Sequence, residues 1–279
     1  MSVIEQFTDV DLVVPPNGCA KGLGPVDHNY DIEEREKDKE ALAALPNFGD
    51  VYSNKLIPMS EWSNYEDAHQ TLRPMVPYIM NQKSEPSCAS HAQVQCMQTC
   101  GRVLYGDVFP KLSALSIYHF VRVRGGGSFI STNMEQARKV GALPLDTPEN
   151  KEKWPHTHVS FGENKSLPNG YQETAKYFQV EGWLRVTTPE EWFAALLGNN
   201  FINYGRDGHA IASIFPQKSR GNWVFGYANS WGQWGDGGFG YDSLGKIRNC
   251  TGYAIQSVTT FDQAEPVVLA ESQSETHYA

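Results

Sequence analysis

The chain has 279 residues, enough for one large domain or for two lobes that share a core, and 40% of them are hydrophobic. The formal net charge of −9, without a dense stripe of Lys and Arg, argues against a nucleic-acid-binding protein. No apolar run reaches the roughly 18 residues that span a bilayer, and no secretory signal is visible, so we expect no membrane partner.

The cysteine content indicates a reducing environment. The five cysteines are Cys19, Cys88, Cys96, Cys100 and Cys250. An odd number with irregular spacing argues against a disulfide framework. We therefore expect a cytoplasmic or virion-associated protein that keeps at least one cysteine for its reactivity.

Residues 1–55 are expected to form an N-terminal extension. Residues 1–30 are rich in Pro and Gly and predict an extended arm, and residues 31–45 predict a charged helix with Asp31 as a candidate cap. Two interpretations stay open. The helix is solvated and packs only its Ala/Leu end, or the extension is a pro-segment or docking arm that covers a cleft.

A compact domain is expected over residues 56–262, followed by a polar tail at 263–279. Periodicity and start signals predict helices at 88–104, 131–140 and 188–197, the last with Thr188 as its cap and Pro189 in its first turn. Strands are predicted at 209–215, 222–228 and 253–261. A turn containing Q-K-S-R-G joins the first two strands, and a Gly-rich loop after them leads to a further strand. Helices first and strands later indicate a two-lobed α+β fold.

The first candidate catalytic residue is Cys88, at the predicted start of a helix. The helix dipole and free amide groups there favour the thiolate over the thiol. Gln82 lies six residues earlier, on the loop that enters the helix. Its side-chain amide is placed to donate a hydrogen bond to a developing oxyanion.

The second group of candidates comes from the predicted strands. His209 opens one strand, and a neutral imidazole is the usual partner that takes a proton from a thiol. Asn229 ends the following strand, so a hairpin would bring its amide oxygen to the imidazole N–H and fix the ring. Trp231 is expected to lie over this pair and exclude water.

These segments resemble the papain family of cysteine peptidases. The family carries a glutamine six residues before a cysteine at a helix start, then an H-A motif, then N-S-W-G-x-x-W-G. Here Gln82 and Cys88 keep the spacing, H-A stands at 209–210 and N-S-W-G at 229–232. The resemblance covers roughly residues 56–260. This sequence departs from the family at E-P-S-C-A (85–89), where the family has C-G-S-C-W. Its glycine-rich loop, W-G-Q-W-G, is one residue shorter than the family's W-G-x-x-W-G.

The resemblance implies a helical N-terminal lobe, whose central helix starts at the nucleophile, and an antiparallel β-barrel-like C-terminal lobe. It also implies a cleft in which Gly126 and Gly127 pair with substrate backbone and Phe129 is a candidate wall of a specificity pocket. Gly208 and Trp231 are assigned to substrate binding as well.

The expected function is that of a peptidase with a Cys-His-Asn triad and a thioester acyl-enzyme, acting on polypeptides without a metal or organic cofactor. Two alternatives stay open. The relaxed surroundings of Cys88 and the extra terminal segments favour a papain-like scaffold that joins a larger protein assembly, such as a virus particle, through its termini. Transamidation or deamidation would keep the nucleophile and change the reaction.

Five other residues receive ordinary structural interpretations. Cys96 and Cys100 follow the apolar stripe of the first helix and are expected to be buried. His91, one turn after the nucleophile, is expected to point sideways from the cleft. His156 and His158 have no further ligands near them in sequence and are expected in a surface loop.

Overall fold

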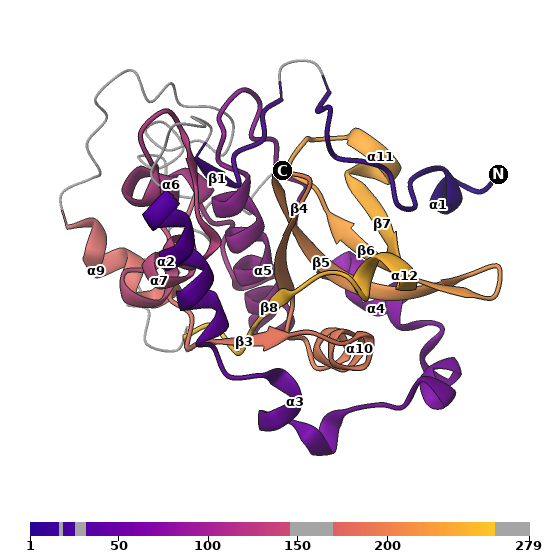
Figure 1. Ribbon diagram of the computed structural model, residues 1–279. Coiled ribbons are helices and arrows are strands. Elements are labelled where there is room, and N and C mark those ends of the chain that lie inside the picture. Colours follow the sequence, from indigo (N-terminus) through magenta and orange to yellow (C-terminus); the bar gives the residue numbers. More distant parts are fainter. Residues whose placement is uncertain (17–18, 26–31, 146–169, 260–279) are drawn as a thin grey trace, which may run out of the picture.

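The computed structural model describes residues 1–16, 19–25, 32–145 and 170–259 (Figure 1). The α-helices of this part of the chain are α1 (Val3–Gln6), α2 (Ile32–Ala43), α3 (Phe48–Val51), α4 (Ala68–Leu72), α5 (Cys88–Tyr105), α6 (Ala114–Val121), α7 (Ile130–Lys139), α9 (Tyr171–Ala175), α10 (Pro189–Leu197), α11 (Trp234–Gly237) and α12 (Leu244–Ile247). The strands are β1 (Gly24–Pro25), β2 (Gly127–Ser128), β3 (Trp183–Val186), β4 (Ile202–Arg206), β5 (His209–Ser219), β6 (Asn222–Ala228), β7 (Phe239–Ser243) and β8 (Gly252–Ile255).

The α+β class is confirmed. Helices α2, α5, α6, α7 and α9 gather on one side of the molecule, and most of the large sheet lies on the other (Figure 1). The sheet is antiparallel, with strand order β3-β8-β4-β5-β6-β7. No ladder in the described residues joins its edge strands β3 and β7, so this lobe is open at that point. The domain boundaries at 56 and 262 stay predictions, and the tail at 263–279 lies outside the described residues.

Helix α5 is the central element and confirms the predicted helix at 88–104. All of its residues from Cys88 to Gly101 are buried, because it packs between the other helices and strands β4 and β5. Two of its buried polar side chains are paired with neighbouring elements. Oγ of Ser90 donates to Oδ1 of Asn133 at 2.5 Å, and Gln93 accepts from Nδ2 of Asn203 at 3.3 Å.

Three further helix predictions match the structure. Helix α7 falls on the predicted 131–140, and α2 falls on 31–45, although Asp31 itself lies outside the described residues. Helix α10 begins as predicted, with Pro189 in the first turn and Thr188 as the cap. Thr188 and Glu191 form a capping box, each side chain bonded to the other's backbone N–H.

Two tight hairpins differ from the sequence prediction. Strand β5 runs to Ser219, so the turn to β6 is only Arg220–Gly221, not the longer Q-K-S-R-G segment. Both turn residues have positive φ (47° and 83°), the backbone that two-residue hairpins need. The same geometry at Asp207 and Gly208 (55° and 71°) joins β4 to β5. Strands β3 and β4 were not predicted from the sequence. The strand predicted at 253–261 is shorter in the structure, where it forms β8.

The N-terminal residues are packed onto the domain. Residues next to α1 bond the outer edge of β7, where Asp9 N donates to Tyr241 O at 2.8 Å. Further on, β1 pairs with β2, and Asp38 of α2 accepts from Ser131 N at the start of α7 at 3.0 Å.

No helix in the described part of the chain is long and apolar enough to cross a membrane.

Glu191 connects α10 to the N-terminal residues, and we expect its loss to destabilise the protein. Its carboxylate accepts from the N–H groups of Thr187 (2.7 Å), Thr188 (3.1 Å) and Gly49 (3.1 Å). Glu191→Ala removes these part-buried hydrogen bonds, although Gly49 N keeps Oδ1 of Asn47 as an acceptor, and should lower the free energy of unfolding by about 1–2 kcal/mol in urea denaturation. Glu190→Ala removes a carboxylate from the same turn without these bonds, and an equal loss there would contradict the interpretation.

Candidate active site

Cys88 is the first residue of α5, and its side chain is fully buried. The sulfur accepts two backbone N–H groups, from Gly22 at 3.2 Å and from Ala210 at 3.4 Å. Ala210 follows His209 in β5, so the packing of α5 on this strand brings the sulfur beside the histidine. The structure therefore brings together two residues that are 121 positions apart.

His209 is held from two sides. Its ring Nε2 lies 2.8 Å from Oδ1 of Asn229, the residue after β6. An amide oxygen only accepts, so this contact assigns the ring proton to Nε2. Nδ1, which is unprotonated in this tautomer, has no hydrogen-bond partner among the described residues. Trp231 stacks on the ring, with centroids 4.4 Å apart and planes inclined by 24°.

Gln82 is positioned by the segment that carries Asn229 and Trp231. Its backbone N–H donates to Ser230 O at 2.8 Å, and the hydroxyl of Ser230 donates to its Oε1. Because Oε1 is engaged, the amide nitrogen is the group directed at the site. That nitrogen donates to Glu85 O and to Ala20 O, both at 2.9 Å.

The N-terminal segment crosses this site. The sequence left open that the extension covers a cleft, but not which of its residues would do so. Ala20 O also accepts from Nε1 of Trp231 at 3.2 Å, and Leu23 N donates to Gly208 O at 3.3 Å. Beyond Leu23, β1 pairs with Gly127 and Ser128 of β2. The described residues 19–25 thus lie in the groove between the start of α5 and the start of β5.

The predicted cleft residues lie at this groove. Gly127, Gly208 and Trp231 all contact the N-terminal segment. Gly126 has a φ of +97°, and a Cβ there would lie 2.8 Å from the ring of Pro86. Phe129 is buried next to β2 and also lines a groove of about 800 Å³ between α2 and α7.

Burial keeps both the cysteine and the histidine neutral, and a nearby cation further disfavours the charged form of the histidine. Burial raises the pKa of Cys88 to about 11, although the N–H groups of Ala210 and Gly22 oppose it. Burial lowers the pKa of His209 to about 3. The hydrogen bond to Asn229 raises this pKa, and the charge of Lys21 lowers it further. At neutral pH the pair is therefore a thiol and a neutral imidazole.

The structure describes three of the five other residues considered in the sequence. His91 is buried, with Nδ1 3.1 Å from Oγ of Ser87 at the start of α5. Cys96 and Cys100 are buried as predicted, and burial raises the pKa of Cys100 to about 12. His156 and His158 lie outside the described residues. Within the described ranges, no three or more His, Cys, Asp or Glu side chains are grouped to hold a metal ion.

No protein-family model and no curated protein matches this sequence. Xylellain, a cysteine protease from Xylella fastidiosa, matches in structure with 16% identity and a TM-score of 0.52 over 89% of this chain and 100% of that chain. Digestive procathepsin L 3 of Tenebrio molitor larval midgut matches with 11% identity and a TM-score of 0.53, over 85% and 76% of the two chains. A recombinant stem bromelain precursor is 15% identical, with a TM-score of 0.52 and the same coverage. At these identities the comparisons show the fold, which is the papain-like fold of cysteine proteases.

We expect the intact protein to contain no Cys88 thiolate at neutral pH. A pKa of about 11 leaves a thiolate fraction of about 10⁻⁴ at pH 7, and the fraction rises only as pH approaches the pKa. The difference in thiolate absorbance between the wild type and Cys88→Ala should stay near zero up to about pH 10. An inflection below pH 8 would contradict the neutral pair.

Proposed function

We propose that the protein is a cysteine peptidase that hydrolyses peptide bonds through Cys88. The observation that supports it best is that the sulfur of Cys88 lies 3.4 Å from the backbone nitrogen of Ala210, the neighbour of His209, whose ring is bonded to Asn229. The papain-like fold of cysteine proteases supports the same chemistry at a coarser level.

In the proposed reaction, Nδ1 of His209 takes the proton of Cys88, and the sulfur attacks the carbonyl carbon of the scissile bond. The oxygen becomes an oxyanion that accepts from Nε2 of Gln82, a donor already directed at the site by Ser230. His209 then protonates the leaving amine, and a thioester remains on Cys88.

The second half of the reaction releases the acyl group. His209 removes a proton from water, and the resulting nucleophile attacks the thioester to give a carboxylic acid and the free thiol. The bond from Nε2 to Asn229 keeps the ring in the orientation that both steps need. The Trp231 ring covers this bond and reduces competition from water.

A scaffold without catalysis is the second candidate function. The observation that favours it is that the chain's own residues 19–25 fill the groove and bury the thiol. In that case the termini, and not the groove, would carry the function in a larger assembly. The two functions differ in whether a substrate ever reaches Cys88.

The proposal is tested with the full chain and a mixture of peptides, with cleavage followed by mass spectrometry. Cys88→Ala should abolish turnover while the circular dichroism spectrum is unchanged. His209→Ala should lower kcat/KM by roughly 10²–10⁴-fold, the contribution of a positioned acid–base group, and Asn229→Ala by less. Cys250→Ala, at a half-buried position outside the groove, serves as the cysteine control.

Three outcomes would overturn the assignments. Turnover that survives in Cys88→Ala would mean that another residue is the nucleophile. Equal losses in His209→Ala and Asn229→Ala would contradict an orienting role for the asparagine. Products without an oxygen from ¹⁸O-labelled water would favour acyl transfer over hydrolysis.

A further inference from the structure

We propose that Asp242 is a positioning residue for His209, and that it acts as the counter-ion of Arg206, which lies directly opposite the histidine in the β4–β5 ladder. The inference rests on the proposed peptidase function, because it names a residue that serves the proposed base. Asp242 lies on β7, which is separated from β5 by β6, and its side chain is completely buried.

The turn between β4 and β5 sets the position of His209. Strand β4 ends at Arg206, β5 begins at His209, and these two residues are paired across the turn. Directly opposite residues of an antiparallel pair have Cα atoms roughly 4.5–5.5 Å apart and side chains on the same face. Besides burial, the positive charge of Arg206 is among the causes that lower the pKa of His209. A movement of Arg206 is therefore passed to the histidine.

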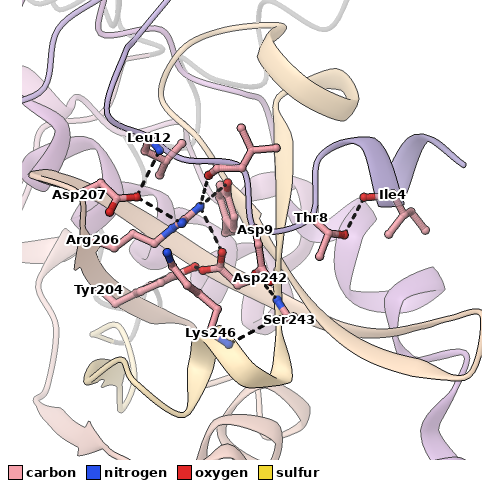
Figure 2. A network of polar contacts seen from close by, with 12 residues as sticks. Ile4, Thr8, Asp9, Leu12, Tyr204, Arg206, Asp207, Asp242, Ser243 and Lys246 are labelled. Carbon is pink, nitrogen blue, oxygen red and sulfur yellow. Dashed lines mark hydrogen bonds and ion pairs between the residues drawn. The ribbon is translucent and has the colours of Figure 1, made fainter. Parts of the chain in front are cut away.

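The guanidinium of Arg206 is held by groups from several elements (Figure 2). Its Nη1 donates to Oδ2 of Asp207 at 3.3 Å, and its Nη2 donates to the hydroxyl of Tyr227 at 3.2 Å and to Val10 O at 2.7 Å. Nη2 also lies 3.2 Å from Oδ1 of Asp242. The carboxylate of Asp242 is completely buried, whereas that of Asp207 is 23% exposed, so Asp242 is the principal counter-ion.

The network joins two strands that are not neighbours. In the sheet, β5 and β6 lie between β4 and β7, so a flat sheet would place the outer two roughly 14 Å apart. Yet Tyr204 of β4 donates to Oδ2 of Asp242 at 2.6 Å, and Arg206 reaches the other oxygen of the same carboxylate (Figure 2). The sheet is therefore curled here, and the carboxylate of Asp242 fixes the end of β4 from across it.

The ion pair is better explained by placement than by stability. A buried ion pair contributes little net stability, because desolvation of the two charges offsets their attraction. Loss of one partner has a larger effect, since it leaves the other charge buried without compensation. Without Asp242, the guanidinium of Arg206 would turn toward Asp207 or toward water, and either movement would pull on the turn before His209.

The pair also sets the charge next to the proposed base. In the proposed reaction His209 becomes an imidazolium when it takes the proton of Cys88. An uncompensated guanidinium nearby would disfavour this charged ring. The carboxylate of Asp242 offsets the charge of Arg206 while it keeps that side chain in place, so the turn is held without a net positive charge beside the histidine.

The charge of Asp242 is lost at mildly acidic pH. Burial raises the pKa of Asp242 to about 6, although the charge of Arg206 and the hydrogen bond from Tyr204 lower it. The titratable and charged groups that face Asp242 are Arg206 and Tyr204 of β4, Tyr227 of β6, Lys246 of α12, Asp9 near the N-terminus and Cys250 before β8. Below about pH 6 the protonated carboxyl no longer balances Arg206, so the histidine should lose its fixed position there.

The test follows the Nε2–H proton of His209 by NMR in the full chain, where the bond to Asn229 protects it from exchange with water. The resonance is assigned by its absence in His209→Ala. In the wild type we expect it at pH 7.5 and expect its loss on acidification with a midpoint near pH 6. Asp242→Asn should lose it already at pH 7.5. The double variant Arg206→Gln/Asp242→Asn keeps polar groups at both positions without either charge, and should regain the resonance and keep it below pH 6.

A second cluster of the same composition provides the matched control. Asp236 pairs with Arg73 at 2.9 Å and accepts from the hydroxyl of Tyr241, so it resembles the Asp242 cluster in chemistry. Asp236→Asn should leave the His209 resonance and its pH midpoint unchanged. In the peptide cleavage assay, Asp242→Asn should lower kcat/KM roughly 10²-fold, the effect of a misplaced catalytic group, and the double variant should recover most of it.

Circular dichroism separates misplacement from unfolding. A His209 resonance that persists in folded Asp242→Asn would overturn the positioning role. Loss in the double variant as well would overturn the counter-ion role. If Asp242→Asn does not fold, the wild-type titration decides, and a resonance that shows no transition near pH 6 would overturn the proposal. Resonances that respond as expected in a protein that cleaves no peptide would support the positioning role and contradict the peptidase function.

Discussion

The packing of α5 against β5 is the constraint on which the site depends. It sets the sulfur of Cys88 3.4 Å from the backbone nitrogen of Ala210, next to His209. Because every residue of α5 from 88 to 101 is buried, the helix cannot shift or tilt without leaving cavities or unpaired polar groups. A buried helix of this kind gives the nucleophile a fixed position that a surface loop would not.

Polar contacts then extend this fixed position to the rest of the site. Gln82 is joined by backbone and side chain to Ser230, and the neighbouring Asn229 holds His209. Two short chain segments therefore orient both the oxyanion donor and the imidazole. Gly22 and its neighbours lie beside these groups, and the sulfur of Cys88 accepts the Gly22 N–H.

Part of this arrangement could be predicted from the sequence, because it depends on which side chains stand at which positions. Helix periodicity predicted α5, and the position of Asn229 after a strand predicted its contact with His209. Strand β4 was missed although Asp207-Gly208 is a strong hairpin signal. The path of residues 19–25 could not be derived, since the contacts of Ala20 and Gly22 use backbone atoms, which every sequence supplies equally.

The two hairpin turns of the sheet should differ in their tolerance of added residues. Hairpin loops at a surface usually accept insertions at modest cost. The Arg220–Gly221 turn lies far along β5 from His209 and fits that description. In the Asp207–Gly208 turn, an added residue would change the register of Arg206 with His209, and so move the histidine relative to Cys88 and Asn229. The length of the Asp207–Gly208 turn is therefore fixed by the geometry of the site, which the composition of the turn does not show.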